Sequence, residues 1–154
     1  MCCARSPIGR DWFVAWTESD VHRDVRVAVL RALWDMPERE AAWRVFEEAA
    51  RSTDPAVAAG VIRIPADRLS STAQRRLARL LSLLLRHGEA KIRLDTLKRC
   101  ASLPVADTER ALLQPVLNAL RSMVPDEVKA AASARSTWAL SRLVKHVSNA
   151  SQRW

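Results

Sequence analysis

Apolar residues recur at intervals of three and four along most of the chain, the spacing of one face of an α-helix. Proline or a capping residue separates neighbouring segments. Three glycines and the lack of alternating apolar and polar positions argue against a sheet. The pattern therefore predicts an all-α protein, with helices over residues 25–37, 38–51, 56–64, 70–87, 90–102, 106–123, from 126 and from about 136.

Three of these helices carry local predictions. Gly88 follows the 70–87 helix, where glycine suits a left-handed C-terminal position. Pro115 lies inside the 106–123 helix and predicts a kink, because proline removes a backbone hydrogen bond. The last helix, expected to begin near Ser136, has five apolar positions: Trp138, Leu140, Leu143, Val144 and Val147.

Two segments 67 residues apart have nearly the same pattern. VRVAVLRALWDMP at 25–37 aligns without a gap with IRLDTLKRCASLP at 92–104. A repeat of about half this length, found throughout a chain, is typical of stacked helix pairs, since each pair has a face that it cannot bury alone. The β-branched residue that opens such helices recurs at intervals of 32, 35 and 36 residues, at Val25, Val57, Ile92 and Val128.

The repeated segments resemble the second helix of HEAT repeats, in which Asp precedes Val-Arg and then Ala and Leu at helical spacing. DVRVAVLRAL at 24–33, EAKIRLDTL at 89–97 and PDEVKAAASA at 125–134 have this pattern, and DPAVAAG at 54–60 is a weaker copy. The chain is similar to short bacterial HEAT-like arrays, with a period below the 40–47 residues of HEAT and armadillo units. The resemblance implies an α-solenoid of about three to four stacked antiparallel helix pairs in a right-handed superhelix.

The same resemblance implies a domain organisation. Residues 1–18 would be an N-terminal tail or partial cap helix, 19–148 the repeat domain and 149–154 a C-terminal tail. We expect the chain to be part of a larger HEAT-repeat protein. In this family a ladder of polar contacts joins neighbouring repeats. Here its bases would be Arg26, Arg93 and Lys129, with acids such as Asp24 and Asp126 nearby.

The net charge of +8 is unevenly distributed. Residues 1–62 carry −2, residues 63–99 carry +7 and residues 100–154 carry +3. Of the 25 bases 21 are Arg, which suits bidentate contact with carboxylate or phosphate. The same excess of Arg is also typical of a GC-rich genome, so composition alone does not distinguish a binding surface from codon usage.

Four bases are predicted to line the concave surface, because second helices face it in HEAT-like arrays. On the 90–102 helix, Lys98 lies on the polar face with Asp95 and Ser102. The opposite face is formed by Ile92, Leu94, Leu97 and Ala101. Arg31 aligns with Lys98 across the 67-residue shift. Such a face could bind an acidic protein helix or a phosphate backbone, or could be a solvated surface. The predicted binding residues are Arg31, Lys91, Lys98 and Arg99.

Motifs of known chemistry are missing from the sequence. No phosphate-binding glycine loop, nucleophile elbow or H-E-x-x-H is present. Cys2, Cys3 and Cys100 form no zinc-type cluster with the three histidines. We therefore predict no metal, no cofactor and no enzymatic activity. No segment has the pattern of a bilayer span or a signal peptide, which predicts a cytoplasmic protein without membrane contact.

The predicted function is a non-enzymatic interaction or scaffold module that binds a protein or another domain of its parent protein. The alternative is a nucleic-acid-binding HEAT-like protein with a basic concave surface, a class that includes DNA alkylation-repair glycosylase-like enzymes. That family resemblance implies a basic groove, Trp side chains and an Asp. Asp35, directly after Trp34, is the one candidate for that acid.

Overall fold

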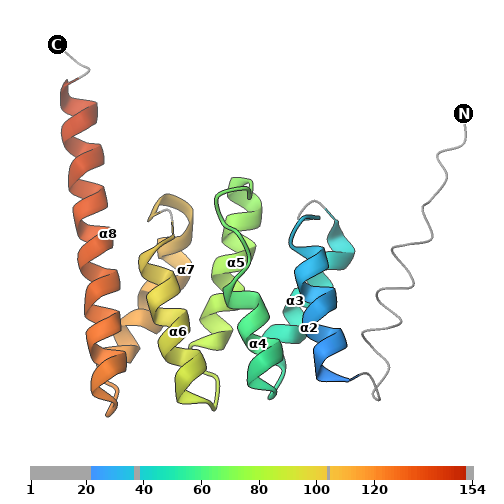
Figure 1. Cartoon of the computed structure of the whole chain (residues 1–154). Helices are drawn as coiled ribbons and strands as arrows, with labels where there is room; N and C mark the ends of the chain where they lie inside the picture. Colours follow the sequence, from blue (N-terminus) through green and yellow to red (C-terminus); the bar gives the residue numbers. More distant parts are fainter. Residues whose placement is uncertain (1–21, 37–38, 104, 152–154) are drawn as a thin grey trace, which may run out of the picture. The chain divides into compact units, whose positions relative to one another are not determined.

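The computed structural model describes residues 22–36, 39–103 and 105–151, and within these ranges every regular element is an α-helix (Figure 1). The all-α prediction is confirmed there. The predicted N-terminal tail or cap at 1–18, with Cys2 and Cys3, lies outside the described residues, as do 152–154. The helices are α2 (Arg23–Leu33), α3 (Glu40–Arg51), α4 (Pro55–Ile62), α5 (Ser71–Leu84), α6 (Ala90–Ala101), α7 (Val105–Ala119) and α8 (Pro125–Ser151).

Short polar side chains begin several of these helices. The Asp54 carboxylate accepts a hydrogen bond from the Ala56 N–H at 2.9 Å, and Pro55 occupies the first turn of α4. Ser70 Oγ accepts from the Ala73 N–H at 3.3 Å and begins α5. These contacts satisfy N–H groups that lack a partner inside the helix. The Ser-Thr-Asp-Pro segment at 52–55 and the serines at 70–71 therefore begin helices α4 and α5.

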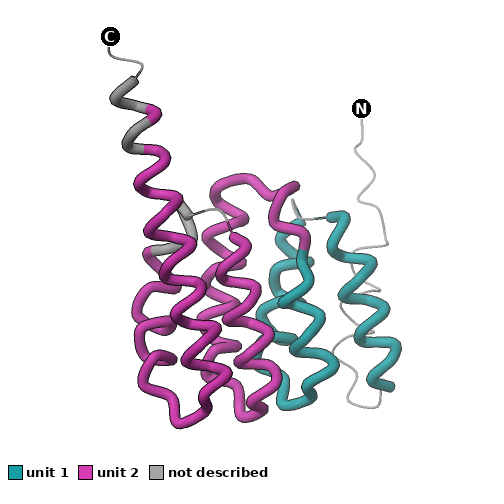
Figure 2. The backbone as a smooth tube through the Cα atoms, turned by 60° about the vertical axis from the view of Figure 1, so that its left-hand side comes forward, with its two compact units in different colours: residues 1–64 teal, residues 65–154 magenta. Residues whose placement is uncertain are grey.

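The chain divides into two compact units, residues 1–64 and 65–154 (Figure 2). In unit 1, α4 packs against both α2 and α3. Its core is formed by apolar side chains from all three helices, and Trp43 meets Phe46 edge to face with ring centroids 5.5 Å apart. In α4, Gly60 lets the helix approach Leu30 of α2, because a Cβ there would lie 2.6 Å from Leu30 Cδ1.

Unit 2 contains two helix pairs, α5 with α6 and α7 with α8. The first helices of the pairs pack together, α5 on α7, and so do the second helices, α6 on α8. Leucines of α5, α6 and α7 fill the space between these layers. Trp138 of α8 is fully buried, and its indole N–H donates to the Cys100 carbonyl of α6 at 3.1 Å.

The prediction of two helices between 126 and 147 is wrong: α8 is one helix of 27 residues. No proline or glycine follows Pro125 in it, and its alanines favour the helix, so Ser136 does not begin a new one. Of the apolar residues predicted near its end, Trp138 is buried, whereas Leu140, Leu143 and Val144 are exposed. The Val147 side chain lies outside the described residues.

Two other local predictions have different outcomes. Gly88 does not adopt a left-handed conformation, since no described glycine has a positive φ. The last turn of α5 is instead closed by the Leu85 N–H, which donates to Leu81 and Leu83 carbonyls. Pro115 does lie inside α7, and that helix ends at Ala119 rather than 123.

Candidate interaction grooves

A groove of about 460 Å³ lies between α6 and α8 in unit 2. Lys98 of α6 and Lys129 of α8 stand on opposite walls, and both are exposed. Small or apolar side chains lie between them, and Asp126 is at the α8 N-terminal end. The lining residues are Leu94, Lys98, Ala101, Asp126, Lys129, Ala130 and Ser133.

Unit 1 has its own groove, of about 220 Å³, between α2 and α4. Arg31 of α2 and Arg63 of α4 stand on opposite walls and are exposed. The surface between them is again apolar, with one acid, Asp24. The lining residues are Asp24, Val27, Arg31, Trp34, Ala56, Ala59, Gly60 and Arg63.

The two grooves use partly equivalent positions of the repeat. The 67-residue shift that aligns 25–37 with 92–104 relates three of the four α2 lining residues to the α6 lining, whereas Asp24 aligns with Lys91, which lines neither groove. A shift of 70, one residue less than the 71 between Val57 and Val128, relates the α4 lining to that of α8. The pairs are Val27 and Leu94, Arg31 and Lys98, Trp34 and Ala101, then Ala56 and Asp126, Ala59 and Lys129, Gly60 and Ala130, Arg63 and Ser133. The base of the α2 and α6 walls is therefore repeated, whereas the base of the other wall is at a different position in each unit, Arg63 on α4 and Lys129 on α8.

The clearest difference between the grooves is at one equivalent pair. Trp34 puts a large indole into the unit 1 groove, whereas Ala101 leaves that place open in unit 2, and the unit 1 groove is the smaller. The Trp34 Nε1–H is buried and has no hydrogen-bond partner in the described structure. A buried donor without an acceptor is costly, so the Trp34 indole carries an energetic cost at this position.

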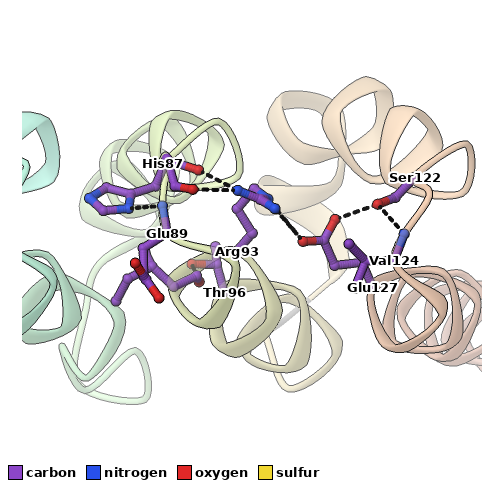
Figure 3. A network of polar contacts seen from close by, with 9 residues as sticks. His87, Glu89, Arg93, Thr96, Ser122, Val124 and Glu127 are labelled. Atoms are coloured by element: carbon purple, nitrogen blue, oxygen red, sulfur yellow. Dashed lines mark hydrogen bonds and ion pairs between the residues drawn. The ribbon is translucent and has the colours of Figure 1, made fainter.

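An ion pair between Arg93 of α6 and Glu127 of α8 joins the two helices that line the unit 2 groove (Figure 3). Arg93 Nε donates to Glu127 Oε1 at 2.9 Å, and Ser122 Oγ donates to Oε2 at 2.7 Å. Arg93 Nη1 also donates to the carbonyls of His87 at 2.8 Å and Gly88 at 3.0 Å. Glu127 is only 4% exposed, so these donors replace its lost water. The pair fixes α6, α8 and the turn before α6 relative to one another.

Unit 1 has a corresponding pair one helical turn earlier. Arg23 Nε of α2 donates to Asp54 Oδ2 at 2.8 Å, and Asp54 precedes α4. Arg23 and Asp54 are each three residues before the positions equivalent to Arg93 and Glu127. Burial alone would raise the pKa of Asp54, but the Ala56 N–H and the Arg23 guanidinium together hold that pKa below its usual value.

The structure separates the four predicted binding residues. Arg31 and Lys98 line the two grooves, whereas Lys91 and Arg99 line neither. Lys91 is exposed in the first turn of α6, and Arg99 Nη1 donates to Ser102 Oγ at 3.3 Å.

The predicted face of α6 needs a correction. Leu94 and Ala101, assigned to the side opposite Lys98, line the same groove as that base, while Ile92, Leu97 and Cys100 form the buried side.

Two groove bases were not predicted as binding residues. Arg63 follows the weak copy of the repeat at 54–60, and Lys129 was assigned to the ladder. Aligning 56–63 with 126–133 pairs Arg63 with Ser133 and Lys129 with Ala59, so the repeat gives no signal for either base.

The predicted ladder residues have different surroundings. Arg93 makes the ion pair to Glu127, whereas sequence had suggested Asp126, which lies in the groove. Arg26 is half-buried on α2, and Lys129 is exposed in the groove.

Catalytic and metal chemistry have few candidates among the described residues. Asp35 is exposed beyond the end of α2 and does not line the adjacent groove. No cluster of three or more His, Cys, Asp or Glu side chains there could hold a metal ion. None of the described helices combines the length and apolar character required to cross a bilayer.

No protein-family model, curated protein or solved structure matches the chain.

Proposed function

We propose that this chain is a non-enzymatic protein-interaction module, formed by HEAT-like helix pairs stacked as an α-solenoid and belonging to a larger repeat protein. The observation that carries this proposal is a groove in each unit with a base on each wall, of which Arg31 on α2 and Lys98 on α6 occupy the same repeat position. Repeat proteins bind partners through surfaces that recur from unit to unit. The partner would be a protein or another domain of the same parent protein.

The chemistry of the grooves favours an acidic protein segment. Between the bases of each groove lie alanine, glycine or aliphatic side chains, which can accept apolar side chains of a partner. Two exposed bases on facing walls suit carboxylates, which steer association and fix register. An amphipathic helix in a groove presents both kinds of side chain at once.

Phosphate fits the same grooves less well. Each groove includes one acid, Asp24 in unit 1 and Asp126 in unit 2, which would repel a nucleic-acid backbone. Each groove also offers only two bases, whereas tight phosphate binding uses many such contacts. Nucleic-acid binding is therefore treated as an alternative outcome of the test.

The test compares two labelled probes by fluorescence anisotropy at about 50 and about 200 mM salt. One is a helical peptide with repeated Glu residues on an alanine background, and the other is a short DNA duplex. The peptide should bind more tightly than the duplex. Lys98→Glu combined with Lys129→Glu should weaken the peptide about tenfold, which corresponds to about 0.7 kcal/mol for each lost pair.

The matched control is Arg79→Glu combined with Arg110→Glu, which reverses two exposed bases of α5 and α7 outside the groove and changes the net charge by the same amount. It should change peptide binding far less than the groove variant. An equal loss in both variants would reduce the interaction to general charge attraction and contradict the proposal. Tighter binding of the duplex, lost steeply at the higher salt, would contradict it in favour of nucleic acid.

A further inference from the structure

The C-terminal half of α8 has an exposed apolar stripe. α8 continues well past α6 and α7 in its own unit (Figure 1). Beyond Trp138 it leaves Leu140 and Leu143 each 63% exposed and Val144 68% exposed. Apolar residues spaced three and four apart on an exposed helix form a seam that another helix can cover.

The stripe lies on the same face of α8 as the groove. Eleven residues make about three turns of an α-helix, so positions eleven apart share a face. Lys129 and Leu140 are eleven apart, and so are Ser133 and Val144. Since Lys129 and Ser133 line the groove, the groove and the stripe form one continuous strip along α8.

The side of α8 that packs in unit 2 points the other way. Ala131, Ala134 and Trp138 are fully buried and follow one another at helical spacing. At 100° per residue, this buried face and the Leu140 to Val144 stripe are on roughly opposite sides of the helix. The stripe is therefore not a displaced part of the unit 2 core.

The charge of α8 selects the kind of partner. Residues 128–151 contain four bases, Lys129, Arg135, Arg142 and Lys145, and no acid. Two copies of α8 face to face would bring these like charges together, which disfavours self-association through the stripe. A partner with carboxylates near the groove would instead be attracted.

We propose that the strip from Lys98 and Lys129 to Val144 binds one amphipathic helix of a partner protein, acidic at the groove end and apolar at the stripe end. Lys129 and Val144 are separated by about 22 Å along α8, so the bound helix needs about 15 residues. Carboxylates would meet Lys98 and Lys129, and leucine-type side chains would cover Leu140, Leu143 and Val144. This inference rests on the proposed function and specifies its partner.

The test uses three labelled peptides of about 15 residues. The first has Glu residues in its N-terminal half and Leu residues at helical spacing in its C-terminal half. The second has the reversed sequence, because the partner can run in either direction. The third has the acidic half alone on an alanine background. Each is titrated with the wild-type chain, with Leu140→Ser combined with Val144→Ser, and with Lys98→Glu combined with Lys129→Glu.

The stripe variant should weaken one of the two amphipathic peptides about tenfold, in keeping with the loss of partly buried apolar contact. The stripe variant should leave the binding of the acidic peptide unchanged. The groove variant should weaken the binding of both the acidic peptide and that amphipathic peptide. The matched control is Leu83→Ser, an exposed leucine of α5 away from α8, which should change nothing. Circular dichroism melts of all variants should coincide, since these side chains are exposed.

The remaining outcomes separate the two proposals. If the groove variant weakens binding and the stripe variant does not, the stripe has no role and this inference is overturned while the proposed function stands. If no peptide binds the wild-type chain, both fail. Binding to phosphatidylserine vesicles that depends on Leu140 and Val144 would assign the stripe to a membrane surface and overturn the inference. A dimer seen by sedimentation and abolished by the stripe variant would overturn it in favour of a second copy.

Discussion

The Arg93 guanidinium lies 2.9 Å from the Glu127 carboxylate and joins α6 to α8 through a nearly buried acid. Both groove bases of unit 2 follow these residues closely, Lys98 on α6 and Lys129 on α8. The ion pair therefore connects the two helices that form the groove walls. Its loss should affect both stability and the shape of the groove.

Arg93→Met should lower the free energy of unfolding by about 3 kcal/mol, because it leaves the Glu127 carboxylate buried without its cation. Urea unfolding of the purified chain would measure this. Combining Arg93→Met with Glu127→Leu should recover much of the loss, since the double variant buries no charge. A double variant as unstable as the sum of the two single changes would contradict a direct interaction between the two residues.

Gly60→Leu should disrupt the packing of α4 on α2, because even the added Cβ would lie 2.6 Å from Leu30 Cδ1. Gly60→Ala should be milder, since about 1 kcal/mol of helix propensity offsets part of the strain. Leu30→Val removes the atom that the new Cβ would meet. The Gly60→Ala change should therefore cost less in a Leu30→Val background, and thermal unfolding of the four variants would show whether the two sites are coupled.

Stability should fall in acid partly through Asp54. Its pKa is lower in the folded chain than in the unfolded chain, so the unfolded chain binds the proton more readily. This contribution is fully present above the usual Asp pKa and is lost as the pH falls through the folded value. Asp54→Asn keeps a helix-capping side chain but removes the charge. Urea midpoints from about pH 5 to about pH 2 should therefore vary less in this variant than in the wild type.

The Cys100 thiol should resist alkylation until the protein unfolds. Burial raises its pKa to about 12, which leaves little thiolate at neutral pH. The experiment uses a Cys2→Ser, Cys3→Ser background, so that only Cys100 can react with iodoacetamide. Rapid labelling without denaturant would show that α6 opens readily at this position.

The same thiol should destabilise the fold in alkali. Above the ordinary thiol pKa of 9.0 the unfolded chain releases a proton that the folded chain keeps, so stability should decline from there towards about pH 12. Cys100→Ala should show a shallower decline. An identical alkaline profile in both proteins would exclude this thiol as a contributor.

The periodic pattern was enough to place the helices before α8, because each of them buries an apolar stripe that the sequence displays directly. It placed Ile92 and Leu97 on the packed side of α6 but put Leu94 and Ala101 on the wrong side of Lys98. Residues that line a groove can be apolar as well as residues of the core. Apolar character alone therefore does not distinguish half-buried groove residues such as Leu94 from core residues such as Leu97.

The single helix α8 was missed for a related reason. Leu140, Leu143 and Val144 have core-like spacing, so the sequence suggested a second packed helix there. The face of α8 that packs is made of alanines and Trp138, which give a weak apolar signal. Glu127 was likewise unpredictable as a buried acid, because its partner Arg93 is 34 residues away in sequence.

The different occupants of one repeat position, Trp34 and Ala101, have a consequence for selectivity. Neither is among the core leucines, and each sets how much space its groove offers. Exchange of one side chain at this position changes the space in a groove and leaves the buried core unchanged. Under the proposed function, the two units can therefore differ in selectivity independently of their folding, and Trp34→Ala is the substitution that tests this.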